Sequence, residues 1–369
     1  MTYREALFFV GKCLTLGHYP TRIGEVREVI RSGSVAWEQI VWVSTSQYVF
    51  PAVYLQLKRA GLLEELPTAL VEYMEEYTDV NRERNKQIID QAREIAALLN
   101  PHEINLVFLK GTGYLLDGLY EDIAERMVGD IDLLVDEKDM VRAAEVLISN
   151  GYGTLEKFYP LDLNRNRHYP SLANSNYMAG VEIHRQIIRV PYQNAVDFEL
   201  IATKSRKLNQ LDSAYVPGNE HQILYNILNF QLNDESFYYA SVFFRQMYDL
   251  FLLSMRENPL TVVRNFGSFF NCMNANLAAS NMLLGDPVSI SYQHDWHAKI
   301  FLKRINRHIN HPGWARFSHS VLHVLLVISN TIRVVIAAIS NQGVRRSVYA
   351  HLRDPKWYGT LIESYKKVY

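Results

Sequence analysis

The sequence predicts an α+β protein in which a small α/β centre lies between two helical regions. Apolar residues recur every three or four positions over the first hundred residues and again after about residue 197, which indicates helices. Between residues 101 and 196, short β-branched runs alternate with helical segments, as in a compact α/β unit. Hydrophobic residues make up 48% of the 369 residues, which is enough for a sizeable core. We therefore expect three regions, 1–100, 101–196 and 197–369.

The first strand and helix of the centre follow the N-terminal helices, whose period is clearest in residues 37–61 and 81–100. Residues 104–110 are apolar and partly β-branched, so they predict a buried strand. Gly111 ends this strand, and residues 114–120 predict the helix that follows it.

The rest of the centre repeats this alternation. Residues 130–136 predict a second strand, and residues 137–151 predict a helix that ends at Gly151. Residues 181–187 alternate between apolar and polar side chains, which predicts a further strand.

Helical periodicity returns in the C-terminal region, most clearly in residues 221–232 and 241–255. Arg245 and Asp249 are four residues apart in the second of these segments, which predicts an intrahelical ion pair. The less favoured alternative is that both line the cleft opposite the strands.

One segment, residues 321–340, approaches the length that spans a membrane. His323, Asn330 and Arg333 interrupt it and fall near one side of a helix, so we expect a mostly buried helix with a polar stripe. We expect no integral membrane segment, and peripheral membrane contact is the less favoured alternative.

Net charge and cysteine content indicate which partners and which cellular compartment to expect. The formal net charge is −1, so global charge does not support binding to nucleic acid. Cys13 and Cys272 lie far apart and form no C-x-x-C motif, which suits a reducing compartment. We therefore expect a cytoplasmic protein.

Two carboxylates open the apolar second strand of the centre. Asp130 and Asp132 are two residues apart, so in a strand both project to one side while Ile131 faces the other. Carboxylates held side by side repel each other unless a cation lies between them, and Mg²⁺ favours carboxylates together with substrate phosphates. The pair predicts a metal clamp for a phosphate-bearing ligand. The alternative is that both aspartates cap the strand and face water.

The surroundings favour the metal clamp. Lys110, Gly111 and Thr112 form a turn that offers a positive charge, a close backbone approach and free N–H groups to a phosphate. Arg126 offers a further cation, although a salt bridge to Asp122 or Glu125 is its structural alternative.

The third strand adds further polar side chains to the expected site. Glu182 and His184 share one face of this strand. Glu182 offers a third carboxylate, and we group His184 with the nucleotide-binding residues. The alternative for Glu182 is an ordinary exposed strand glutamate.

These motifs resemble a known family. A strand followed by Lys-Gly and a helix, then R-x-x-x-D-I-D-L-L-V, then V-E-I-H, is similar to bacterial nucleotidyltransferases of the DNA polymerase beta superfamily, in a branch known as uncharacterised nucleotidyltransferases. N-R-E-R-N before the first strand, His168, and F-F-R-Q-M-Y-D-L at residues 243–250 resemble that branch too. The resemblance covers about residues 35–255.

The resemblance implies a small mixed sheet backed by helices and a metal-dependent transfer of a nucleoside monophosphate from an NTP to an acceptor hydroxyl. Asp130 and Asp132 would bind divalent metal, Mg²⁺ or Mn²⁺, and Glu182 would be the third acidic residue. Gly111-Thr112 takes the place of the superfamily's commoner Gly-Ser turn. The resemblance does not identify the acceptor.

Two other functions remain open at this point. A non-catalytic protein on the same scaffold would bind nucleotide or a partner without releasing pyrophosphate. A glycosyltransferase would use the D-x-D pair to hold a sugar nucleotide, but it should have a nucleotide-binding α/β region well before that pair. Here the preceding hundred residues have a helical pattern.

Overall fold

The structure is a computed structural model that describes residues 1–155, 166–189, 192, 196–209, 211 and 213–353. The first hundred residues are helical, as predicted. Their α-helices are α1 (Tyr3–Cys13), α2 (Thr21–Arg31), α3 (Trp37–Ser46), α4 (Phe50–Arg59) and α5 (Thr68–Leu99).

Residues 37–61 form two helices, α3 and α4, although their helical period is continuous. Tyr48 has a φ of 56°, in the left-handed region, and Pro51 occupies the first turn of α4. Proline lacks the N–H that a continuing helix needs, so the chain breaks here and starts a new helix.

A mixed sheet forms the centre, as predicted. Its strands are β1 (Leu106–Phe108), β2 (Asp130–Leu134), β3 (Gly153–Thr154), β4 (Leu172–Ala173), β5 (Gly180–His184), β6 (Arg206–Lys207) and β7 (Ala214–Val216). Their order in the sheet is β3-β4-β5-β2-β1-β7-β6. β2 runs parallel to β5 and antiparallel to β1, while β1 runs parallel to β7.

The three predicted strands of the centre are confirmed as β1, β2 and β5. Two short strands, β6 and β7, lie beyond residue 196, within the range predicted to be helical. The division of the chain into three regions stays a prediction.

Two helices connect the strands that carry the candidate site. α6 (Lys110–Leu116) follows β1 and begins earlier than predicted, while α7 (Met140–Ser149) follows β2. Gly151 has a φ of 91° directly after α7 ends. Glycine adopts this left-handed conformation without the penalty of a Cβ, which accounts for the predicted end of the helix.

The C-terminal region is mostly helical. Its helices are α8 (Phe198–Thr203), α9 (Asn219–Leu228), α10 (Ser236–Tyr239), α11 (Phe244–Ser254), α12 (Pro259–Asn265), α13 (Phe270–Leu283), α14 (Trp296–Asn310), α15 (Pro312–Ser340) and α16 (Gln342–Leu352). The predicted helices at residues 221–232 and 241–255 are confirmed as α9 and α11, with a π-helical turn at Asn229–Asn233 extending α9.

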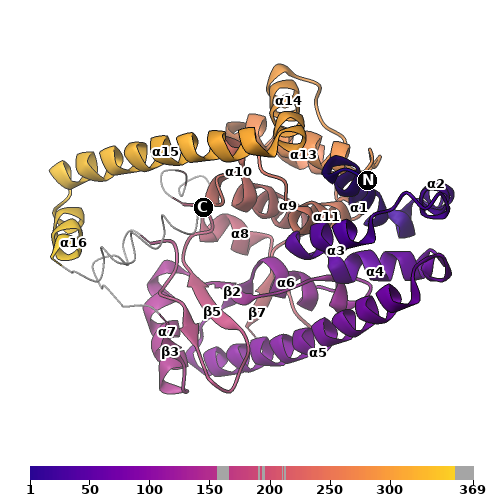
Figure 1. Cartoon of the computed structure of the whole chain (residues 1–369). Helices are drawn as coiled ribbons and strands as arrows, with labels where there is room; N and C mark the ends of the chain where they lie inside the picture. The colour runs from indigo at the N-terminus through magenta and orange to yellow at the C-terminus, as the bar shows by residue number, and fades with distance from the viewer. Residues whose placement is uncertain (156–165, 190–191, 193–195, 210, 212, 354–369) are drawn as a thin grey trace.

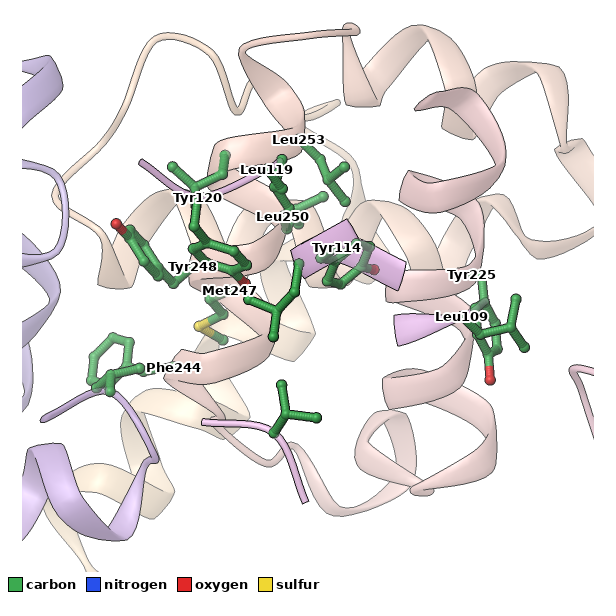
Figure 2. Packing of buried hydrophobic residues seen from close by; sticks show 14 of the residues in the cluster. Leu109, Tyr114, Leu119, Tyr120, Tyr225, Phe244, Met247, Tyr248, Leu250 and Leu253 are labelled. Atoms are coloured by element: carbon green, nitrogen blue, oxygen red, sulfur yellow. The ribbon is translucent and has the colours of Figure 1, made fainter. Parts of the chain in front are cut away.

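The core joins the α/β centre to the C-terminal helices. Figure 2 shows Tyr114, Leu119 and Tyr120, which come from α6 and the segment after it, lying near the α11 side chains Tyr248 and Leu250. The rings of Tyr120 and Tyr248 are 6.2 Å apart, and both are buried. This contact fixes α11 against the sheet side of the molecule.

The prediction of a mostly buried helix at residues 321–340 is wrong. These residues belong to α15, and no residue of α15 is buried. Figure 1 shows α15 running along one side of the molecule and ending at α16, at a distance from the sheet. Hydropathy measures how apolar a segment is, but not whether the rest of the chain packs against it.

Candidate functional site

Two parallel strands bring the predicted acidic residues together. In the register of β2 and β5, Asp132 lies opposite Glu182, and Asp130 lies opposite Gly180. Because side chains alternate along a strand, Asp132, Glu182 and His184 project to one face of the sheet. His184 Nε2 lies 2.8 Å from Asp132 Oδ1 and 3.3 Å from Glu182 Oε2. The sheet therefore assembles a compact group of two carboxylates and one imidazole.

Lys110 completes this group from the end of β1. Its Nζ lies 2.6 Å from Asp132 Oδ1. Lys110 has a φ of 47°, a left-handed conformation that costs a residue other than glycine about 1–2 kcal/mol. Such strain persists where surrounding structure enforces it, and it is frequent at functional sites. Here it occurs where the chain turns from β1 into α6 beside the acidic group.

Charge pairing outweighs burial for Asp132. Its burial favours the protonated form, but Lys110 and His184 hold the pKa of Asp132 well below its usual value. The hydrogen bond to His184 lowers the pKa of Glu182 as well. Burial would lower the pKa of Lys110, yet the charge of Asp132 raises it, so the lysine is firmly cationic. Asp132, Glu182 and Lys110 are therefore charged at neutral pH.

Asp130 has the opposite behaviour. Burial of its carboxylate and the negative charge of Asp132 raise the pKa of Asp130, and Lys110 only partly offsets them. Asp130 is the first residue of β2 and is more exposed than Asp132, so its burial is only partial. It is the acidic side chain whose negative charge is least compensated, and a bound cation would relieve this repulsion.

The donor set fits a divalent cation. Ligand atoms of Asp132, Glu182 and His184 all lie within 4.8 Å of one another. Asp132 Oδ1 already accepts from Lys110 and His184, but among the described residues neither Asp132 Oδ2 nor the Asp130 carboxylate has a hydrogen-bond partner. Carboxylate oxygens suit Mg²⁺ and Mn²⁺, and an imidazole is more favourable for Mn²⁺ than for Mg²⁺.

This group differs in one member from the predicted metal set of Asp130, Asp132 and Glu182. His184, which the sequence placed among the nucleotide-binding residues, lies within the group, and Asp130 lies beside it. The metal role of Asp130 stays a prediction.

The Gly111-Thr112 turn packs against the segment that leads into β2. A Cβ on Gly111 would lie 2.9 Å from Val128 Cγ2, so a larger residue here would push the two segments apart. The Thr112 hydroxyl donates to the carbonyl of Asp130 at 3.2 Å. Both residues therefore hold the start of β2 against α6, and their predicted contact with nucleotide stays a prediction.

Arg126 is buried behind the turn rather than paired with Asp122 or Glu125. Its Nε lies 3.0 Å from Asp249 Oδ1, and its Nη1 donates to the Met127 carbonyl at 2.7 Å. The predicted ion pair between Arg245 and Asp249 is wrong, because the carboxylate of Asp249 faces Arg126 and also accepts from the Tyr120 hydroxyl. The Arg126–Asp249 pair thus links the α/β centre to α11.

Arg245 lies beside the site, although the sequence predicted a structural ion pair for it and did not place it among the nucleotide-binding residues. Its Nη1 donates to the Met127 carbonyl at 3.1 Å, and its guanidinium lies 5.0 Å from the ring centroids of Tyr48 and Phe243. Burial and repulsion from Arg126 lower the pKa of Arg245 to about 10, and its charge lowers the pKa of Asp130. Among the described residues no carboxylate forms an ion pair with it.

His168 and Arg167 approach the group from the segment before β4. The rings of His168 and His184 are 5.2 Å apart. The Nη1 atom of Arg167 is buried and has no hydrogen-bond partner among the residues described. Both residues belong to the locally basic run 164–170, and this basic character was the sequence feature that could have predicted their position near the site. Residues 164 and 165 lie outside the described part of the chain.

Two asparagines of α5 position the chain just before β2. Asn81 Nδ2 donates to the Ala124 carbonyl at 2.7 Å, and Asn85 Nδ2 donates to the carbonyls of Ile123 and Arg126 at 2.6 and 2.7 Å. These are the two asparagines of N-R-E-R-N, four residues apart and so on one face of the helix. The motif therefore fixes the segment that delivers Asp130 and Asp132.

The protein is helical with a mixed sheet, and its parallel strands β2 and β5 present acidic side chains beside the Lys110-Gly111 turn. This arrangement is the one expected of the nucleotidyltransferase class. The chain belongs to a family described as uncharacterised nucleotidyltransferase, whose family model matches residues 33–283. No curated protein matches the chain.

Proposed function

We propose that this protein is a cytoplasmic, metal-dependent nucleotidyltransferase that moves a nucleoside monophosphate from an NTP to an acceptor hydroxyl. The observation that carries the proposal is the register of β2 and β5, which sets Asp132 opposite Glu182 while Lys110 contacts Asp132. Family membership supports the reaction class. The net charge of −1 gives no support for a nucleic acid as acceptor.

Asp130, Asp132 and Glu182, with His184 beside them, are the proposed metal-binding residues. When bound, Mg²⁺ or Mn²⁺ would supply Lewis-acid stabilisation of charge on the phosphates and would activate the acceptor hydroxyl. The lowered pKa of Glu182 suits a metal ligand better than a general base, because a base of low pKa holds a proton poorly.

Lys110 and Arg245 are the proposed contacts to the triphosphate. Lys110 is partly exposed and donates one hydrogen bond to Asp132, so its ammonium retains donors for a phosphate oxygen. Arg245 forms no ion pair with a carboxylate among the described residues, and the positive charge of its guanidinium lowers the pKa of Asp130. Two such cations can offset charge on the β- and γ-phosphates.

The remaining predicted nucleotide-binding residues have protein partners. The Thr112 hydroxyl is bonded to the Asp130 carbonyl and the Arg126 guanidinium to Asp249. We propose that Gly111 and Thr112 contribute through the backbone turn, while Arg126 supports that turn from behind. A Cβ on Gly111 would lie 3.6 Å from Arg126 Cζ, which supports this close packing.

One observation favours a second function, non-catalytic nucleotide binding. The Lys110 ammonium lies on Asp132 Oδ1, so the protein already supplies a cation to that carboxylate. A glycosyltransferase is disfavoured, because helices α1–α5 precede the sheet and no α/β region comes before the D-x-D pair within residues 1–100.

Pyrophosphate release distinguishes these functions. The protein is incubated with Mg²⁺ or Mn²⁺ and each NTP in turn, and pyrophosphate and covalent self-labelling from α-labelled NTP are measured. Asp132→Asn should abolish release, whereas Asp90→Asn, a change at an exposed aspartate of α5, should leave it unchanged. The unmodified protein is also tested with candidate acceptor hydroxyls. If it binds NTP but releases no pyrophosphate in the presence of metal, the non-catalytic function is supported instead.

A further inference from the structure

Helix α15 exposes its whole apolar side to solvent. It has 29 residues, none of them buried, and it is long and apolar enough to cross a membrane by length and composition. Exposed apolar surface of this extent is rare on a soluble monomer unless something binds there.

The exposed apolar residues form one continuous face. They follow each other at intervals of four and three residues, the spacing that places side chains on one side of a helix. Ile328, Ile332 and Ile339 are 50%, 53% and 73% exposed, and Val321, Leu325 and Val335 belong to the same face. The face therefore extends over about five turns of α15.

The polar side of α15 faces the body of the protein. His319 Nε2 lies 2.9 Å from the Tyr239 carbonyl, and His323 Nδ1 lies 3.5 Å from the Tyr239 hydroxyl. Farther along this side, Arg333 is exposed, and its charge lowers the pKa of Tyr238, which the hydrogen bond with Tyr192 and burial raise. These contacts to α10 set the rotation of the helix, so the apolar face points away from the protein.

The region around this face is strongly cationic. From Trp296 to Arg353, which covers α14, α15 and α16, the sequence contains nine Lys and Arg residues and no Asp or Glu. The whole chain has a formal charge of −1, so the rest of the protein is acidic. Arg345 and Arg346 are exposed on α16, and the exposed aromatic rings of Trp314 and Tyr349 lie near the two ends of the apolar face.

This charge distribution identifies the occupant of the face. A second copy of the chain would bring an identical cationic region against this one, and like charges would repel. An anionic lipid surface offers the complementary charge together with an apolar phase for the isoleucines. Tryptophan and tyrosine are favoured at the boundary between these two environments.

We propose that α15 lies in the plane of an anionic lipid bilayer, with its apolar face inserted and the cations of α14 and α16 on the lipid headgroups. The in-plane orientation follows from the contacts of His319 and His323 with Tyr239 of α10, because a spanning helix would have to break them and would place Arg333 in hydrocarbon. The proposal is independent of the proposed catalytic function.

Vesicle binding by the full chain tests the proposal. The purified protein is sedimented with vesicles of phosphatidylcholine alone and with vesicles that also contain phosphatidylglycerol. We expect strong binding to the second kind only, weakened by added salt. Ile332→Asp should weaken this binding by about tenfold or more, because it removes inserted apolar surface and adds an anion. Val288→Asp, a change at a residue that is 85% exposed outside the face, should bind like the wild type.

The alternatives give different results. Equal binding by Ile332→Asp and wild type, with matching melting temperatures, would overturn the proposal. Analytical ultracentrifugation without lipid gives a second test. A wild-type dimer that dissociates in the Ile332→Asp variant would also overturn the proposal, because the face would then be an interface between copies of the chain. Membrane-bound protein that resists alkaline carbonate and is released only by detergent would indicate a spanning helix and overturn the in-plane orientation. Replacing Arg345 and Arg346 by Gln should weaken binding to anionic vesicles, which separates headgroup attraction from apolar insertion.

Discussion

Lys110 Nζ lies 2.6 Å from Asp132 Oδ1, so a cation predicted to contact the nucleotide is bonded to a carboxylate predicted to bind the metal. His184 shares the same carboxylate oxygen from the other strand. The two predicted halves of the site, phosphate-binding and metal-binding, are therefore one electrostatic unit in this structure. A change in either half should alter the other.

Replacing Lys110 by Met should separate its two roles. We expect the KM for NTP to rise by about tenfold or more, because a charge-assisted contact to phosphate is lost. Mn²⁺ affinity without nucleotide should not fall, because Asp132 Oδ1 no longer has a competing cation. Steady-state kinetics and calorimetric titration with Mn²⁺ measure these quantities. Lys138→Met changes an exposed lysine and serves as the control. Greatly weakened Mn²⁺ binding by Lys110→Met would mean that Lys110 organises the metal site.

Asn substitutions at the two aspartates should affect stability in opposite directions. Asp132→Asn leaves Lys110 with a neutral partner, and we expect a loss of about 1–3 kcal/mol in the free energy of unfolding. Asp130→Asn removes a carboxylate whose pKa is raised, and we expect a small gain in melting temperature without metal. Added Mg²⁺ should remove this gain by stabilising only the wild type.

Turnover distinguishes these variants from ordinary stability mutants. Both should lose at least about 100-fold in rate, measured by pyrophosphate release with circular dichroism as the check on folding. A destabilising effect of Asp130→Asn that resembles that of Asp132→Asn would contradict the distinction drawn between the two carboxylates.

Acid should weaken the fold through Asp132. Its pKa is lower in the folded protein than in the unfolded chain, where it is about 3.9. The stability that its ionised form contributes is therefore present above about pH 4 and is lost as pH falls through the folded value. Urea unfolding between neutral and acid pH should show this loss, and the profile of Asp132→Asn should be flatter on the acid side. Parallel profiles would mean that Asp132 does not dominate acid sensitivity.

Sequence patterns predicted the strands of the site and the side chains that share one face of a strand, because both depend on neighbouring residues in the sequence. The D-I-D-L-L run predicted β2 because its first residues alternate between polar and apolar, as the two-residue period of a strand requires, and the shared face of Glu182 and His184 followed from the same period. Long-range partners were harder to predict. Asp249 lies four residues from Arg245 but pairs with Arg126, which is 123 residues away in the sequence. Helical spacing gave a possible pair, while the packing of α11 against the sheet determined the actual one.

Residues 321–340 give a second example in which packing partners could not be predicted from the sequence pattern. Apolar content and a polar stripe predicted a buried helix, and the amphipathic pattern is present in α15. His319 and His323 contact α10 while the apolar side faces solvent, which is the reverse of a core helix. Asn330 and Arg333, farther along the stripe, are exposed. Periodicity alone cannot specify which side of an amphipathic helix has a partner.

Replacing Arg245 tests a cation for which the sequence predicted only an intrahelical ion pair. Arg245→Gln should raise the KM for NTP by about tenfold while changing kcat less, if its guanidinium binds phosphate in the ground state as well as in the transition state. Arg264→Gln, at the end of α12, is the control. An unchanged KM would assign Arg245 to structural support through its contacts with Met127 and Tyr48.

Asn85→Ala tests whether α5 positions the strand that carries the aspartates. The change leaves the part-buried carbonyl of Ile123 and the buried carbonyl of Arg126 without this donor, and a lost bond costs about 1–3 kcal/mol when its partner stays buried. Asn81 still donates to Arg126, so we expect a loss of about 2–3 kcal/mol in total, measured by urea unfolding. Gln87→Ala changes an exposed residue two positions along the same helix and should have little effect.

Catalysis gives the second readout for Asn85→Ala. Because the carbonyls that it holds precede Asp130 by only a few residues, a shift of this segment would displace both aspartates, and misplacement by about 1 Å can cost about 100-fold in rate. We therefore expect turnover to fall more than the remaining folded fraction explains, with Mn²⁺ affinity reduced in parallel. Full turnover per folded molecule would show that the β2 and β5 register holds the aspartates without α5.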